Sequence, residues 1–358
     1  MSKKIIFSSG GTGGHILPAI HLMNHFSKRG YDVILVTDHR GKNLLNKINY
    51  KFYTIKSETI IKKNFFKKII SLFVIIISLF KSYFILKKEK PDLVFGFGGY
   101  ASFPISFVSK FFKIPLIIYE NNLILGRSNK YLLSISRKIL LGTSLPINFP
   151  EKYKNKVQLV GNILREEILN FSKNLKKNNN EIFSILILGG SQGADIFGKI
   201  IPPAIKKLKD KGYNIKINQH CVESQKKFLD EFYRKNNIKC NTFIFTEKIL
   251  DFLASSDLAI SRCGASTTAE LVYTLTPFIA VPYPYSMDNH QYINAKYYQT
   301  KGCCWLIKQE DFTSDNLFNL VIEIMNDKRK LENISKNMQK IVSGNVYNKV
   351  ENIIKEII

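Results

Sequence analysis

The sequence predicts an α/β protein of two doubly wound, Rossmann-like domains with a cleft between them. Short apolar runs alternate with longer amphipathic runs, which is typical of parallel β-α-β units, and this series occurs twice along the chain. Glycine clusters follow several of the apolar runs, at the strand ends where α/β domains bind ligands. The length of 358 residues, 45% of them hydrophobic, fits two domains better than one core.

The N-terminal half contains the first series of predicted elements. We expect strands at Lys4–Ser8, Asp32–Thr37, Tyr50–Thr54, Asp92–Gly96, Pro115–Tyr119 and Lys138–Leu141. The chain becomes polar after Pro150, and the run Lys173–Glu181 is charged and rich in asparagine. Such a composition indicates a surface loop.

The second series begins after that loop. We expect strands at Phe183–Leu188, Asn214–Gln219, Asn241–Phe245, Leu258–Ser261 and Phe278–Val281, each followed by a helical pattern. The two series join near Val160–Arg165. The sequence therefore predicts an N-terminal domain at 1–161 and a C-terminal domain at 162–341.

The formal net charge of +25 is compatible with two kinds of polyanionic partner, nucleic acid and anionic lipid. A general preference for Lys, Ile and Asn explains the same charge without any partner. The five cysteines show no C-x-x-C pair and no zinc-type spacing, so we expect neither disulfides nor a structural metal. With glycines from Gly10 onward, the N-terminus does not resemble a signal sequence, and we expect a cytoplasmic protein.

One apolar segment, Phe65–Leu86, stands apart from the rest. Its stretch Ile69–Phe80 has twelve residues without a charge, and lysines flank it on both sides. Twelve residues are too few to span a bilayer, which needs about 20. Burial as a core helix is one interpretation. The near absence of a polar face, together with the flanking lysines, favours shallow insertion among anionic headgroups instead.

The glycine loop Gly10–His15 follows a predicted strand and precedes a helix. Glycines let the backbone approach a ligand, and a helix start offers N–H groups to an anion. It is not a dinucleotide fingerprint, because the third glycine would fall on Ile16. His15 ends the loop where α/β ligands bind, so it is our candidate general base. Glu120, after another strand of this domain, is the alternative base.

A second glycine cluster, Gly189–Ala194, opens the C-terminal domain. It extends into a P-loop-like sequence, but Ile200 replaces the required Ser or Thr, and Gly198 and Lys199 fall inside the expected helix. ATP hydrolysis is therefore not expected. We predict a diphosphate cradle in which Ser191 and backbone N–H groups face negative charge.

The segment Ser261–Glu270 again runs from a strand into a helix start. Its small residues leave room for a phosphate, and Glu270, a turn later, can accept hydrogen bonds from ribose hydroxyls. A capping role for Thr267 is compatible with that site. Polar residues at Asp288–Gln291 follow the last predicted strand, where they could form hydrogen bonds with the hydroxyls of a sugar. The absence of a D-x-D pair, and of a glutamate beside His21 or His25, leads us to expect no metal or other cofactor.

Taken in order, these motifs resemble the MurG family, peptidoglycan enzymes that add N-acetylglucosamine to a lipid-linked muramyl-pentapeptide. The resembling segments are Gly10–His15, Gly96–Tyr100, Tyr119–Asn122, Gly126, Asn129, Gly161, Asn162, Arg165, Gly189–Ala194, Ser261–Glu270 and Asp288–Ala295, which cover nearly the whole chain. The resemblance implies a GT-B fold and an inverting transfer without metal. It also implies that a last helix, about 342–358, returns to the first domain.

The resemblance further implies the partners and the location. The donor would be UDP-N-acetylglucosamine, and the acceptor would be the C4 hydroxyl of undecaprenyl-pyrophosphoryl-N-acetylmuramyl-pentapeptide. The protein would lie as a peripheral enzyme on the cytoplasmic face of the bacterial inner membrane, held to anionic lipid by the 65–86 segment. No nucleic acid is expected.

By motif position, the resemblance also implies roles for individual residues. Donor binding falls on Ser191, Ile249, Ala265, Ser266, Thr267, Thr268, Glu270 and Gln291. Arg165 would lie at the hinge, and Thr12, Gly13, Gly14 and Asn122 would line the opposite wall of the cleft. The chain departs from the family pattern at Tyr119 (usually His), Asn121 (usually Gln), His290 (often Gln) and Ile163-Leu164 (usually Pro-Val). The first two departures leave the acceptor contacts open.

Four other functions stay open on sequence grounds. A UDP-N-acetylglucosamine 2-epimerase would share the donor site and need no lipid surface, and another glycolipid synthase would differ only in its acceptor. A non-enzymatic nucleotide-binding protein would not need the candidate base. The interpretation as a dehydrogenase rests on Gly96–Ala101 alone, which is a weak match to the dinucleotide-binding pattern G-x-G-x-x-A.

Overall fold

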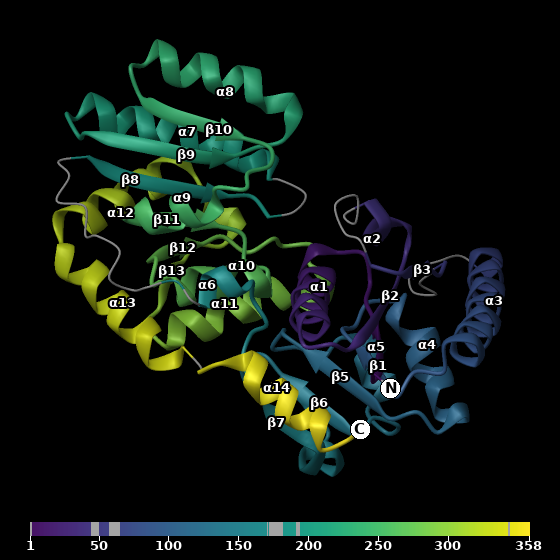
Figure 1. Cartoon of the computed structure of the whole chain (residues 1–358). Helices are drawn as coiled ribbons and strands as arrows, with labels where there is room; N and C mark the ends of the chain where they lie inside the picture. Colours follow the sequence, from purple (N-terminus) through teal and green to yellow (C-terminus); the bar gives the residue numbers. More distant parts are fainter. Residues whose placement is uncertain are drawn as a thin grey trace. The chain divides into compact units, whose positions relative to one another are not determined.

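A computed structural model describes residues 2–43, 50–56, 65–169, 171, 182–190, 194–342 and 344–358. Its contacts divide the chain into two compact units (Figure 1). Unit 1 consists of Met1–Arg165 and Ser343–Ile358, and unit 2 consists of Glu166–Val342. Each unit is a parallel β-sheet flanked by helices.

Unit 1 contains a seven-stranded sheet in the order β3-β2-β1-β4-β5-β6-β7. The strands are β1 (Lys4–Ser8), β2 (Asp32–Thr37), β3 (Phe52–Thr54), β4 (Leu93–Gly96), β5 (Leu116–Glu120), β6 (Lys138–Leu141) and β7 (Val157–Leu159). All neighbours are parallel. The strand order reverses between β1 and β4, which is where doubly wound sheets form ligand crevices.

The helices of unit 1 cover both faces of this sheet. They are α1 (Gly13–Lys28), α2 (His39–Asn43), α3 (Phe65–Glu89), α4 (Ser102–Val108), α5 (Arg127–Leu132) and the C-terminal α14 (Val346–Lys355). The α14 helix docks through Glu351, whose buried carboxylate lies 3.4 Å from His25 on α1 and 2.6 Å from Arg29, the residue after α1. The ring of Tyr347 stacks on His25 with 4.6 Å between centroids.

Unit 2 contains a six-stranded sheet in the order β10-β9-β8-β11-β12-β13. The strands are β8 (Phe183–Leu188), β9 (Ile215–His220), β10 (Lys239–Phe243), β11 (Leu258–Ser261), β12 (Phe278–Ala280) and β13 (Cys304–Leu306). The helices are α6 (Glu166–Leu169), α7 (Asp195–Asp210), α8 (Glu223–Lys235), α9 (Ile249–Ser255), α10 (Ala265–Tyr273), α11 (His290–Thr300), α12 (Ser314–Asn326) and α13 (Lys328–Ile341). Apolar clusters fill both faces of the sheet.

Several strands differ from the sequence prediction; β3, for example, begins at Phe52 and not at Tyr50. The strand expected at Asn241–Phe245 lies two residues earlier, because Phe243 pairs with the last residue of β9 and the apolar residues after it have no strand partner. Phe245 is 78% exposed in the following loop. The edge strands β7 and β13 were not predicted, since each has only three residues and no alternating pattern. Gly198 and Lys199 lie inside α7, as predicted.

The α3 helix has an unusual distribution of side chains. Its inner face carries small polar residues, and Ser71, Ser78 and Ser82 are buried. Its outer face carries large apolar residues, of which Phe73 is 62% and Phe80 is 64% exposed. The other exposed apolar side chains of this face are Ile69, Ile70, Leu72, Ile76, Ile77, Tyr83 and Phe84. The interpretation as a buried core helix is therefore wrong.

The length of α3 also corrects the sequence argument. Over Ile69–Glu89 the helix has 21 residues with a mean hydropathy of 2.4, enough to cross a bilayer by length and composition, and only 28% of that stretch is buried. The uncharged run is only part of the helix, which continues through Lys81 to Glu89.

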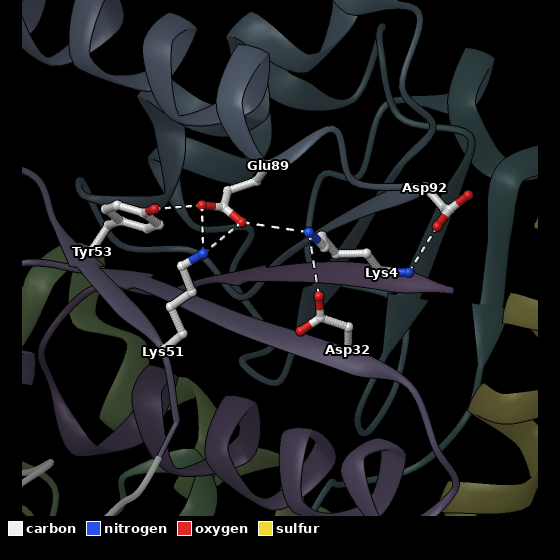
Figure 2. Close-up of polar contacts among 6 residues, drawn as sticks. All are labelled: Lys4, Asp32, Lys51, Tyr53, Glu89 and Asp92. Atoms are coloured by element: carbon white, nitrogen blue, oxygen red, sulfur yellow. Dashed lines mark hydrogen bonds and ion pairs between the residues drawn. The ribbon is translucent and has the colours of Figure 1, made fainter. Parts of the chain in front are cut away.

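A buried carboxylate anchors the end of α3 (Figure 2). The side chain of Glu89 is 3% exposed and lies 2.7 Å from Lys51 Nζ and 3.5 Å from Lys4 Nζ, and it accepts a hydrogen bond from the Tyr53 hydroxyl. Burial acts to raise the pKa of Glu89, but the hydrogen bonds from Lys51 and Tyr53, with the charge of Lys4, lower it overall. The cluster thus joins the C-terminus of α3 to β1 and β3.

We predict that Glu89→Gln lowers the free energy of unfolding of unit 1 by about 2 kcal/mol, because hydrogen bonds to a charged group contribute roughly 1.5–3 kcal/mol. The melting temperature should fall by roughly 4–8 °C. Since the folded pKa of Glu89 is depressed, this stability is fully present above the ordinary value of 4.5 and is lost as pH falls through the folded pKa.

Thermal denaturation at pH 7 and at acidic pH measures both effects. Glu151→Gln is the matched control, because Glu151 forms an exposed ion pair with Lys154 and such pairs contribute about 0–1 kcal/mol. Equal melting temperatures for the Glu89 and Glu151 variants at pH 7 would show that the cluster does not anchor α3.

Candidate functional site

Two glycine loops pack backbone to backbone at the carboxyl edge of the unit 1 sheet. The N–H of Gly10, after β1, donates to the carbonyl of Gly98, after β4, over 2.9 Å. A Cβ on Gly10 would lie 2.9 Å from the Cα of Gly99, and a Cβ on Gly99 would lie 2.6 Å from the Cα of Gly10. Gly99 also has a φ of +78°. Neither position therefore accommodates a side chain.

His15 lies in the first turn of α1, beside these loops. Thr12 precedes the helix with an extended backbone, and its hydroxyl oxygen lies 2.7 Å from His15 Nδ1. The imidazole packs over Gly98, where a Cβ would lie 3.3 Å from His15 Cδ2. A threonine hydroxyl can accept as well as donate. When His15 Nδ1–H donates to it, Nε2 becomes the nitrogen that can take a proton.

Glu120 ends β5 at the same edge, and its side chain is enclosed by donors. One oxygen accepts from the backbone and side-chain nitrogens of Asn122, both at 3.1 Å. The other accepts from Gly126 N at 2.8 Å and Asn129 Nδ2 at 3.0 Å. Asn121 adds a bond to the Gly14 carbonyl over 2.9 Å. The carboxylate therefore organises the loop after β5, and Asn121 joins that loop to the start of α1.

Unit 1 thus brings together six of the predicted site residues. These are Thr12, Gly13, Gly14, His15, Glu120 and Asn122, which follow β1 or end β5. Tyr119, whose role the resemblance left open, points elsewhere. Its hydroxyl accepts from Ile163 N over 3.1 Å and donates to the Gly161 carbonyl over 3.3 Å.

The residues that lead to the unit boundary are held by tyrosines. Tyr119, on β5, holds Gly161 and Ile163, and the hydroxyl of Tyr347, on α14, donates to the Leu164 carbonyl. The predicted hinge residue Arg165 follows immediately and is the last residue of this part of unit 1. The chain therefore leaves unit 1 directly after a segment fixed from two sides.

Unit 2 presents the start of α10 at the carboxyl edge of β11. The cap residue Gly264 has no side chain to bond the first amides, so the N–H groups of Ala265, Ser266 and Thr267 have no acceptor within the helix. The Ser266 hydroxyl is a buried atom with no partner in the part of the chain that the structure describes. The Thr268 hydroxyl, in contrast, bonds to the Gly264 and Ala265 carbonyls inside the helix.

The remaining predicted donor residues belong to several segments of unit 2. Gln291, in the first turn of α11, accepts from Cys263 N at 3.1 Å and Tyr283 N at 3.0 Å, so its amide group remains as a donor. Glu270 is half-buried in the second turn of α10, and Ile249 begins α9. Ser191 lies outside the described residues, and the chain approaches it through Gly190, with a φ of +78°.

Titratable side chains do not gather into a metal site in the described ranges. No group of three or more His, Cys, Asp or Glu residues there could hold an ion. All five cysteines are free thiols, and burial raises the pKa of Cys240 to about 12. The arrangement instead offers uncapped amides, hydroxyls and one carboxylate on unit 2, and an imidazole beside glycines on unit 1.

Comparison with known proteins identifies the family to which this chain is similar. Residues 5–141 match the glycosyltransferase family 28 N-terminal domain, and residues 184–356 match its C-terminal domain. A relative from Pelagibacter ubique, named UDP-N-acetylglucosamine–N-acetylmuramyl-(pentapeptide) pyrophosphoryl-undecaprenol N-acetylglucosamine transferase, is 36% identical over 98% of this chain and 97% of its own length.

Solved structures share the fold. The crystal structure of Acinetobacter baumannii MurG matches with a TM-score of 0.82 at 23% identity, over 99% of this chain and 100% of that chain. A UDP-N-acetylglucosamine 2-epimerase matches with a TM-score of 0.65 at 14% identity, over 98% of this chain and 95% of that chain. The architecture is therefore common to transferases and epimerases, and the site must distinguish them.

Proposed function

The chain belongs to the MurG family within glycosyltransferase family 28, and on that premise we propose that it transfers N-acetylglucosamine from UDP-N-acetylglucosamine to the C4 hydroxyl of undecaprenyl-pyrophosphoryl-N-acetylmuramyl-pentapeptide. The two parallel-sheet units have the GT-B type of fold. Two observations carry the proposal: an uncapped helix start with a buried hydroxyl on unit 2, and His15 beside the glycine loops of unit 1.

We assign the nucleotide donor to unit 2. The first amides of α10 and the glycine loop before Ser191 provide N–H groups for the diphosphate, where the helix dipole also favours negative charge. Glu270 would accept hydrogen bonds from the ribose hydroxyls. The side-chain amide of Gln291, oriented by its two backbone donors, would donate to the sugar. Ile249 would contact the nucleobase of the donor.

We assign the acceptor and its activation to unit 1. His15 Nε2 would remove the proton from the C4 hydroxyl as that oxygen attacks the anomeric carbon, while the bond to the UDP oxygen breaks on the opposite side. The geometry favours His15 over Glu120 as the base. Both oxygens of Glu120 accept hydrogen bonds that hold the β5 loop, so taking a proton there would disrupt the loop.

The outer face of α3 supports a location at a lipid surface. The exposed apolar side chains of this face would enter the headgroup region of the bilayer, and the lysines near both ends would attract anionic lipid. We therefore propose that residues 1–161, with the C-terminal segment 342–358, form the acceptor and membrane domain, and that 162–341 bind the donor. The enzyme would lie on the cytoplasmic face of the inner membrane.

A direct assay separates this proposal from epimerisation. The protein is incubated with radiolabelled UDP-N-acetylglucosamine, with and without the lipid-linked muramyl-pentapeptide. Label in the lipid fraction supports transfer. A labelled sugar isomer that forms without acceptor would identify an epimerase instead.

His15→Ala is expected to lower turnover by at least about a hundredfold, because a general base typically contributes about 10²–10⁴-fold. Donor affinity should stay nearly unchanged, and EDTA should leave turnover unaffected. Steady-state kinetics with titration calorimetry measure these quantities, with His21→Ala on the same helix as control. Near-normal turnover, or loss of donor binding alone, would reassign the base to Glu120 or to another residue.

Glu270→Ala is expected to weaken binding of UDP-N-acetylglucosamine by about a hundredfold or more, since it removes a pair of hydrogen bonds to a charged acceptor, each of about 1.5–3 kcal/mol, and about 1.4 kcal/mol is tenfold in affinity. Calorimetry measures the affinity, and Glu310→Ala, which removes an exposed carboxylate of unit 2, is the control. An unchanged affinity in the folded Glu270 variant would refute the ribose assignment.

Phe73→Ser combined with Phe80→Ser should reduce flotation with anionic liposomes, while soluble donor binding persists. Both side chains are exposed, so the fold loses little packing. Wild-type flotation should also weaken at high salt, because screening reduces lysine attraction. Phe228→Ser, with a side chain 56% exposed on unit 2, is the matched control. If neither the double substitution nor high salt reduces flotation, α3 is not the part of the protein that contacts the lipid.

A further inference from the structure

Arg262 is a buried cation at the carboxyl edge of the unit 2 sheet. It follows β11 directly and is 6% exposed. One terminal nitrogen donates to the carbonyls of Val281 at 3.1 Å and Pro282 at 3.2 Å, and the other donates to Gln309 Oε1 at 2.6 Å. The guanidinium also lies 5.0 Å from the ring centroid of Phe197 and 5.4 Å from that of Tyr283.

All of these partners are neutral. Within the described part of the chain, no carboxylate forms an ion pair with Arg262. Buried arginines are almost always paired, because removing an ion from water is expensive. Burial lowers the pKa of Arg262, and the opposing influences come from Cys263 and Tyr283. Among the described residues, no negative charge therefore pairs with this buried positive charge.

The position of Arg262 indicates where the balancing charge belongs. Its backbone N–H donates to the Leu188 carbonyl at the end of β8, and its Cβ lies 3.7 Å from the place of a Cβ on Gly190. Two residues later, Gly264 caps α10. Arg262 thus lies between Gly190, which follows β8, and the helix start after β11, where we place the donor diphosphate.

We propose that Arg262 is a positioning residue whose buried charge is balanced by the diphosphate of the bound nucleotide. This inference rests on the proposed function, because it concerns the same donor. The guanidinium acts through space, and it stabilises both the bound diphosphate and the charge that gathers on the leaving UDP. In a site shielded from water this attraction is weakly screened by salt.

The test compares UDP with uridine, which lacks the charge. Arg262→Gln should weaken UDP binding by about tenfold or more while uridine affinity changes by less than about twofold. Arg262→Lys keeps the charge without the planar fork, so UDP affinity should stay within about threefold of wild type although the melting temperature falls. Competition against a fluorescent nucleotide measures both affinities in the full-length protein.

Gln309→Glu provides a second test that leaves Arg262 in place. A carboxylate at this position would pair with the guanidinium and balance its charge, so UDP affinity should fall while the melting temperature is maintained or rises. Gln309→Met is its control, because it removes the hydrogen bond without adding charge and should leave UDP affinity nearly unchanged.

The outcomes separate the inference from the proposed function. A wild-type protein that binds neither UDP nor uridine would overturn the proposed function, and the inference with it. If the wild type binds UDP and both Arg262→Gln and Gln309→Glu bind it equally well, only the inference is wrong. Equal losses of UDP and uridine affinity in Arg262→Gln would likewise reduce Arg262 to a structural support.

Discussion

The close approach of Gly10 to Gly99 is the constraint on which the active edge of unit 1 depends. The loops after β1 and β4 touch through their main chains, so both positions require glycine. This contact fixes the start of α1 over Gly98 and with it the imidazole of His15. The bond from Asn121 to the Gly14 carbonyl adds the loop after β5. Three loops from separate parts of the sequence therefore form one support for the proposed base.

Much of the fold could be predicted because its elements are periodic and well separated. The apolar strands and the loops after them follow rules that a single sequence displays. The strand predictions that were wrong or missing concern strands whose bounds depend on a neighbouring strand. The end of β10 is set by the length of β9, and β7 and β13 are defined by hydrogen bonds to a neighbour rather than by their own composition.

The candidate site likewise has features that the local sequence displays and features that only the folded chain displays. Glycine clusters and the Ser261–Glu270 segment are recognisable from residue type, whereas the state of a side chain depends on neighbours distant in the sequence. The sequence favours His15 as the base and leaves Glu120 as the alternative, and the four donors around Glu120 are a further reason for that choice that the sequence does not display. Arg262 attracted no prediction, because an arginine is ordinarily exposed and its burial cannot be read from the motif.

Tyr119 has a consequence for the evolutionary history of the chain. Ile163 is buried, and its N–H relies on the Tyr119 hydroxyl as its acceptor. The proline usual at this place in the resembling family has no N–H and would not need that hydroxyl. With no acceptor at position 119, isoleucine at position 163 would leave a buried donor unsatisfied. Positions 119 and 163 are therefore expected to covary, with an acceptor at the first wherever the second regains its N–H.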